Sequence, residues 1–153
     1  MSTRITTDGY VDGAGGLVTV TGSAILANGT TVFTVAGGPI QIVEIGAVCI
    51  TANGAGATTL QYSADGTNGA ATTITGASAS LANATAGTIV LAVPGTLATA
   101  PAVYANGVGI AGTVNIVVPA GIITNVVATG PTTGTWRQFI RYIPLSPDST
   151  VSG

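Results

Sequence analysis

The chain has no histidine and no lysine, and Cys49 is its single cysteine. Without histidine, the Ser-His-Asp and Cys-His arrangements of nucleophilic catalysis are excluded, and the commonest side-chain metal ligand is missing. A lone cysteine also excludes an intramolecular disulfide. Residues 46–51, Gly-Ala-Val-Cys-Ile-Thr, bring no basic side chain near the thiol. We therefore predict that Cys49 is a small buried hydrophobe and not a reactive nucleophile.

Charge is almost as scarce as histidine. Charged residues make up 5% of the chain and the net charge is −2, whereas soluble domains carry roughly 25% charged residues. A chain this neutral does not attract nucleic acid over long distances, so no nucleic-acid partner is predicted. Low charge also removes a usual protection against self-association. We therefore predict a protein that works in an assembly.

Carboxylates are too few and too scattered to predict a catalytic or metal site. Asp8 and Asp12, in Asp-Gly-Tyr-Val-Asp-Gly, come nearest to a calcium-binding pattern, but the further acidic ligands are missing and two Asp-Gly turns explain the pattern. Glu44 alone lies in a predicted strand, so no carboxylate pair of a glycosidase is indicated. A Gly-x-x-x-x-Gly-Lys phosphate loop is also missing. The sequence predicts no enzyme, no metal, no cofactor and no small-molecule substrate.

Long apolar runs are missing as well. No apolar run follows Arg4, so we expect no signal peptide. Gly, Asn, Thr and Pro interrupt the rest of the chain before any window reaches the roughly 18 apolar residues of a membrane span. We expect synthesis in the host cytoplasm and no membrane partner.

Strand signals, in contrast, are abundant. The chain has 153 residues and a hydrophobic fraction of 46%, which suits one domain with a core. Short runs rich in Val, Ile and Thr alternate with Asn-Gly and Asp-Gly dipeptides, which are typical of tight hairpin turns. These runs predict strands at residues 17–21, 31–35, 40–51, 58–63, 71–75, 88–93, 113–118, 122–129 and 135–145. The fold class predicted is all-β, an antiparallel β-sandwich of the jelly-roll kind.

The two ends of the chain differ from its middle. Residues 1–16 are polar and glycine-rich, and we predict that they form a flexible N-terminal arm. Two interpretations of the arm stay open: a frayed tail, or a segment that orders on a neighbouring subunit with Tyr10 and Val11 as anchors. Residues 17–147 form the predicted sandwich domain, and residues 148–153 a loose C-terminal tail.

The segment TTGTWRQFIRYIPLSP, residues 132–147, holds two of the three basic residues and the only tryptophan. Side chains alternate between the two faces of a strand. Trp136, Gln138, Ile140 and Tyr142 are therefore predicted to face the core, and Arg137, Phe139, Arg141 and Ile143 to face outward. The outer set is either a solvated strand face or an interface anchor, since arginines beside an aromatic ring suit bidentate and stacking contacts.

Glu44 is a candidate partner for these arginines. By alternation it shares its strand face with Ile40 and Ile42. A carboxylate among aliphatic side chains is costly to bury unless a cation pairs with it. We predict that Glu44 pairs with Arg137 or Arg141, either within one subunit or across an interface.

Three stretches, GTTVFTVAGGPIQIVEIGAVCITAN, ATTLQYSADGT and TTGTWRQFIRYIPLSP, resemble a known family. They are similar to small virion proteins of tailed bacteriophages, and above all to capsid decoration (cement) proteins of jelly-roll type. The resemblance covers residues 28–147. It implies a virion protein that binds the outer surface of the assembled major capsid protein, as a homotrimer, and it carries over no catalytic residue.

Other functions fit the same composition. A head-fibre base, tail or baseplate module is one alternative within the virion. A carbohydrate-binding sandwich is another, if the scattered residues Tyr10, Tyr62, Tyr104 and Tyr142 converge into an aromatic platform. A secreted surface-layer protein fits the low charge but would require a signal sequence.

Overall fold

The computed structural model describes residues 4–6, 9–11, 16–109 and 112–153, and these contain strands and no helix. The sequence folds this way because β-branched side chains pack well on pleated surfaces. The strands are β1 (Arg4–Thr6), β2 (Gly9–Val11), β3 (Leu17–Ile25), β4 (Thr31–Ala36), β5 (Ile40–Cys49), β6 (Thr59–Gly66), β7 (Thr72–Thr73), β8 (Ile89–Leu91), β9 (Ala102–Tyr104), β10 (Ile116–Val118), β11 (Gly121–Ala128), β12 (Thr135–Pro144) and β13 (Thr150–Ser152).

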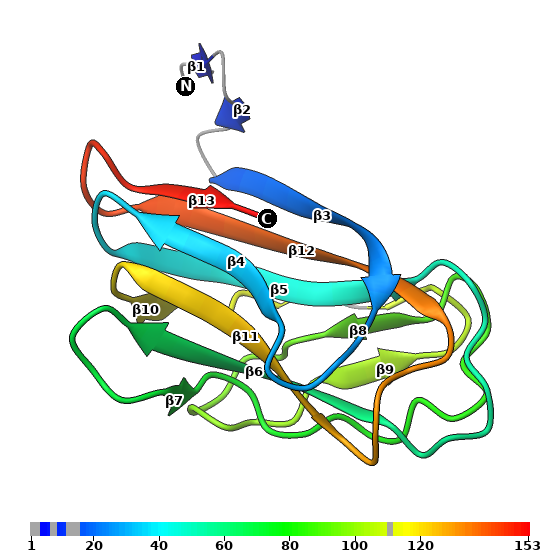
Figure 1. Ribbon diagram of the computed structural model, residues 1–153. Helices are drawn as coiled ribbons and strands as arrows, with labels where there is room; N and C mark the ends of the chain where they lie inside the picture. Colours follow the sequence, from blue (N-terminus) through cyan, green and yellow to red (C-terminus); the bar gives the residue numbers. More distant parts are fainter. Residues whose placement is uncertain (1–3, 7–8, 12–15, 110–111) are drawn as a thin grey trace.

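Two antiparallel sheets make up the sandwich (Figure 1). One has the order β3-β12-β5-β8-β9, with β10 also paired to β5, and the other has the order β13-β4-β11-β6-β7. The two strand orders match each other. The places of β3, β12, β5 and β8 in the first sheet are taken in the second by β4, β11, β6 and β7, and each strand and its counterpart are consecutive in the sequence. This arrangement is that of a jelly roll, in which a long folded ribbon of strand pairs wraps into two sheets. The predicted fold class is therefore confirmed.

All nine predicted strands have a counterpart in the structure, with ends that differ by a few residues. The Asn-Gly dipeptides marked turns correctly, because Gly29 and Gly107 adopt φ values of 75° and 68° in two of them. Four of the described strands were not predicted: β1 and β2, which lie within residues 1–16, and β9 and β13. β9 is three residues long, and β13 lies within residues 148–153, which were expected to form a loose tail. Instead, β13 pairs with β4 at the edge of its sheet.

The core lies between the two sheets and contains side chains from almost every long strand. Each large aliphatic side chain buried there contributes about 1.5–3 kcal/mol to folding. The largest fully buried side chains are Trp136, Tyr62, Phe33, Leu26, Ile40, Ile42, Ile45, Leu60, Leu81, Ile123, Ile140 and Val90.

Hydroxyl and amide side chains form buried hydrogen bonds to the backbone of the loops. Thr132 Oγ1 accepts a hydrogen bond from the backbone N–H of Leu26 at 2.8 Å and donates one to the carbonyl of Gly134 at 2.9 Å. Asn53 donates to the carbonyl of Leu81 at 3.0 Å and accepts from the N–H of Gly134 at 2.9 Å. These buried bonds satisfy backbone groups where strands end, so the polar composition stabilises loops without charge.

β1 and β2 pair only with each other among the described strands. Tyr10 and Val11 belong to β2, opposite Ile5 and Arg4. Their side chains lie outside the described part of the structure, so the two interpretations of the N-terminal arm remain predictions.

Candidate interface on the outer face of β12

The two faces of β12 differ as the sequence predicted. Trp136, Gln138, Ile140 and Tyr142 are buried. The alternate side chains point outward: Arg137 and Ile143 are exposed, and Phe139 and Arg141 are half-buried. This alternation confirms both face assignments for the strand.

Because β12 lies between β3 and β5, its outward side chains have neighbours on both sides. Arg141 is flanked by Val18 on β3 and Glu44 on β5. Phe139 is flanked in the same way by Val20 and Gly46, and Arg137 by Ser23 and Val48. Direct cross-strand partners point to the same side of a sheet, so these three rows form one continuous surface.

The ring of Phe139 is less exposed than the sequence suggested because it lies against Gly46. A Cβ atom added to Gly46 would be 2.9 Å from Cζ of Phe139 and would also clash with the carbonyl oxygen of Val90. The missing side chain therefore leaves room for the ring beside the strand. An aromatic ring placed against a strand glycine compensates for the packing that the glycine lacks.

Glu44 forms an ion pair with Arg141 within the subunit, and Arg137 is not its partner. Arg141 Nε lies 3.5 Å from Glu44 Oε2, with 32% and 16% of the two side chains exposed. Nε is itself buried and makes no hydrogen bond to any described residue. The pair is therefore an electrostatic contact with imperfect geometry, which typically contributes about 0.2–1 kcal/mol.

The predicted face of Glu44 was wrong, because a β-bulge interrupts the alternation. Arg141 pairs with Glu44 and the next residue, Tyr142, pairs with Ile42, so Val43 is an extra residue in β5. Ile40 and Ile42 point into the core, whereas Glu44 points outward beside Arg141. A bulge shifts the two-residue period by one, and here it removes a carboxylate from the core.

Apolar side chains surround the charged ones on this surface. Val18 and Val20 of β3 are 55% and 49% exposed, and Val117 of β10 is 61% exposed. Ile25 pairs with Thr135, and Ile143 and Val117 both pair with Gln41, which puts them on the same side of the sheet. We call this surface the β12 face, defined by Val18, Val20, Ile25, Gln41, Glu44, Val117, Arg137, Phe139, Arg141 and Ile143.

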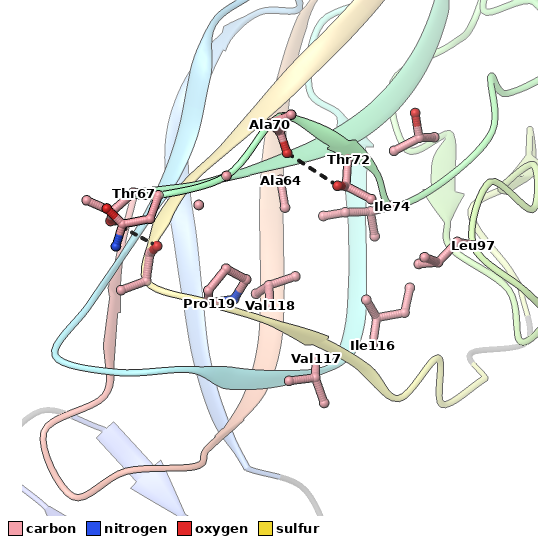
Figure 2. A pocket seen from close by; sticks show the side chains of 15 residues that line it. Ala64, Thr67, Ala70, Thr72, Ile74, Leu97, Ile116, Val117, Val118 and Pro119 are labelled. Carbon is pink, nitrogen blue, oxygen red and sulfur yellow. Dashed lines mark hydrogen bonds between the residues drawn. The ribbon is translucent and has the colours of Figure 1, made fainter.

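An apolar cavity, which shares Val117 with the β12 face, lies at one open side of the sandwich, where β7 of one sheet and β10 of the other form its walls (Figure 2). Its volume is about 540 Å³ and none of its lining residues is charged. Ile74 and Leu97 face Ile116 and Val118 across the same space in Figure 2. The hydroxyl of Thr67 on its rim donates to the carbonyl of Ala120 at 3.1 Å. The cavity suits an apolar group and offers no nucleophile activated by a base.

The three tyrosines whose side chains are described do not form the aromatic platform that a carbohydrate-binding sandwich would need. Tyr62 and Tyr142 are buried in the core. The hydroxyl of Tyr142 accepts a hydrogen bond from the N–H of Val151 at 3.2 Å. Burial raises the pKa of Tyr62 well above its ordinary value. Tyr104 is half-buried on β9, and the side chain of Tyr10 lies outside the described residues.

Cys49 is buried, as predicted. Its thiol donates to the carbonyl of Thr51 at 3.2 Å. Desolvation raises the pKa of Cys49, and a backbone hydrogen bond at Asn53 partly opposes that shift. The thiol is therefore protonated at neutral pH, the form that neither attacks electrophiles nor binds metals.

Within the described ranges, no group of three or more His, Cys, Asp or Glu side chains could hold a metal ion. Asp8 and Asp12, the pair nearest to a calcium pattern, lie outside those ranges. In the same part of the chain, no helix is long and apolar enough to cross a membrane. Comparison of the chain with protein-family models, curated proteins and solved structures found no match.

Proposed function

We propose that this chain is a structural virion protein that binds the outer surface of an assembled phage capsid. In this role it acts as a decoration protein, a homotrimer whose partner is the major capsid protein. The proposal rests on the resemblance carried by residues 28–147 and on one observation, the composition of the β12 face. It requires no catalysis, cofactor or nucleic acid.

The β12 face has the character of a protein interface. Interface cores are depleted in charge and enriched in aromatic residues and Arg. Phe139 lies between Arg137 and Arg141, and exposed valines lie beside them on β3. Glu44 compensates part of the charge of Arg141, so Arg137 remains as the cation for a partner's carboxylate or carbonyl groups.

A neutral, apolar contact also suits a protein that stays bound under varied conditions. Salt screens exposed charge pairs but has little effect on apolar burial at physiological strength. A trimer on a lattice of repeated sites binds multivalently, so modest contacts per subunit give tight attachment overall. The low charge of the whole chain and the apolar β12 face point to the same mode of binding.

The test is a binding assay with capsids assembled from the major capsid protein of the phage that encodes the chain. Purified protein is first sized by chromatography with light scattering, where we expect a trimer independent of concentration. It is then sedimented with capsids at low and at high salt. We expect saturable binding that changes little with salt. A monomer that stays in the supernatant at both salt concentrations would overturn the proposal, and binding to tails instead of heads would favour another virion module.

A further inference from the structure

A second cavity lies at the other open side of the sandwich, between the end of β3 and the start of β4. Its volume is about 220 Å³, far above the roughly 10–15 Å³ that one water molecule requires. Small side chains of β3, from Thr21 to Ala24, form one wall. Trp136, Gln138 and Val32 also line it, and we call it the Trp136 cavity.

Two side chains of this cavity carry buried polar atoms without a hydrogen-bond partner. Trp136 is 1% exposed and Gln138 is 7% exposed. Among the described residues, the indole Nε1 of Trp136 has no acceptor and the Oε1 of Gln138 has no donor. Buried polar groups are hydrogen-bonded in nearly all native proteins, and leaving them unpaired is costly. A hydrogen-bonding occupant of the cavity would remove that cost.

The cavity also lies beside free backbone edges in both sheets. β3 pairs with β12 alone among the described strands. β13 covers only residues 34–36 of β4, so the edge formed by Thr31 and Val32 has no partner strand on that side. Gly153, which follows β13, lines the cavity. The cavity therefore lies beyond the end of β13, along the same edge of β4.

The unpaired atoms and the free edge select the same kind of occupant. Trp136 and Gln138 are two residues apart on β12, and an extended chain repeats its backbone groups on one side every two residues. A peptide strand supplies a carbonyl for the indole N–H and an N–H for the amide oxygen. The lining residues of the cavity include no charged side chain, so an uncharged segment is the electrostatic match.

We propose that the Trp136 cavity accepts an extended, uncharged peptide strand from a neighbouring protein chain. The strand lies along Thr31 and Val32, next to the edge of β4 that β13 leaves uncovered, as in other complexes formed by strand addition. Its backbone bonds the indole of Trp136 and the amide of Gln138. The inference does not depend on the capsid role, and Ile25 is the one residue that lines the Trp136 cavity and also belongs to the β12 face.

The test attaches such a strand to the protein itself, because tethering raises the effective concentration to the millimolar range. One variant carries Thr-Val-Thr-Val after Gly153. Its matched control carries Thr-Pro-Thr-Pro, which has the same length and charge but cannot donate to a ladder at proline. Trp136 is the only tryptophan, so its single indole N–H resonance reports on the cavity directly.

With Thr-Val-Thr-Val we expect a shifted indole resonance and indole exchange slower by roughly two- to tenfold, the factor of one net hydrogen bond. The proline control should match the unextended protein. Gln138→Leu, made in the Thr-Val-Thr-Val variant, should reverse part of the added protection while the circular dichroism stays that of the folded protein. The capped peptide acetyl-Thr-Val-Thr-Val-amide, added to the unextended protein, should shift the same resonance.

Equal indole shifts and exchange rates in the two extended variants would overturn the proposal. So would the detection of a bound water molecule next to the indole proton in the Thr-Val-Thr-Val variant. Capsid binding is measured separately through the β12 face, so failure here leaves that proposal standing.

Discussion

The outer faces of the two sheets differ although the same core supports them. On the sheet of β4, β11 and β6, the outward positions form a hydroxyl- and amide-rich surface, with Thr34, Thr31, Thr124 and Gln61 among them. Val126 is an exception, at 37% exposed. The β12 face on the other sheet carries exposed valines, Phe139 and two arginines. A neutral chain can therefore make one face compatible with water and the other suited to a partner without using many charges.

The largest expected effect separates these two faces directly. Val20→Glu places a carboxylate on the β12 face, and Val126→Glu places one on the opposite face at a similar exposure. A charge buried in an interface centre without a partner is strongly unfavourable, so Val20→Glu should weaken assembly or capsid binding at least 30-fold, about 2 kcal/mol. Val126→Glu should have little effect. Light scattering and co-sedimentation measure both, and equal losses would refute a one-sided interface.

Next in size is the packing of Phe139. Gly46→Ala would drive a Cβ atom into the Val90 carbonyl and the Phe139 ring. Such overpacking lowers the free energy of unfolding by about 1–3 kcal/mol. No described atom lies within 4 Å of the position that a Cβ atom would take at Gly22 in β3, so Gly22→Ala should be neutral or slightly stabilising. Urea denaturation of both variants tests whether the ring is fixed against the sheet.

Stability at alkaline pH depends on Tyr62, a core residue of β6 in the sheet opposite the β12 face. Burial raises the pKa of Tyr62 above its ordinary value of 10.0. The folded state then holds the phenolic proton more tightly than the unfolded state, so this group leaves stability unchanged below that value. Above it, the free energy of unfolding should fall by about 1.4 kcal/mol per pH unit. Denaturation curves at about pH 9 and about pH 11 measure the loss, and Tyr62→Phe should reduce it.

A smaller effect distinguishes the buried hydroxyls of the two sheets. Tyr62 is fully buried and its hydroxyl has no hydrogen-bond partner in the part of the chain that the structure describes, whereas the hydroxyl of Tyr142 accepts a hydrogen bond from the N–H of Val151. Tyr62→Phe should therefore raise the free energy of unfolding by about 1 kcal/mol, and Tyr142→Phe should lower it by about 0.5–1.5 kcal/mol. Thermal denaturation of the pair at neutral pH measures both signs. Destabilisation by Tyr62→Phe would mean that its hydroxyl is satisfied in solution.

The smallest expected effect concerns the ion pair on the β12 face. Glu44→Gln should lower the free energy of unfolding by no more than about 1 kcal/mol, because the pair is partly exposed and lacks good geometry. A double-mutant cycle with Arg141→Gln isolates the pairwise contribution. Asp65→Asn, on the opposite sheet, provides the control and should leave stability unchanged. A coupling well above that size would show a tighter pair in solution than the 3.5 Å contact.

Most of the fold could be predicted from sequence because strand signals are local. Val, Ile and Thr runs, many of them next to Asn-Gly or Asp-Gly turns, locate nine of the thirteen described strands, including every strand longer than three residues, and simple alternation assigns both faces of β12. β13 was missed because residues 148–153 hold one β-branched hydrophobe, Val151, and are ordered by pairing with β4. Such pairing depends on the whole fold and leaves little trace in a six-residue segment.

The candidate site was harder to predict, because its geometry depends on register. The sequence named Glu44 and the two arginines but could not choose between Arg137 and Arg141, since that choice needs the alignment of β5 with β12. Strict two-residue alternation along β5 also placed Glu44 on the wrong face, because it did not include the bulge. Nothing in the sequence indicated that Trp136 and Gln138 would retain unpaired polar atoms beside a cavity, since that depends on how far β13 extends along β4.

The bulge at Val43 has a consequence for how this chain can change during evolution. Central strands normally reject insertions and deletions, because one residue more or less inverts every side chain beyond it. β5 already contains such an extra residue, and its ladder on either side is in step without it. Deleting Val43 would therefore leave Ile42 facing inward and Glu44 facing outward. Related sequences that lack one residue in this strand should align with their gap at Val43.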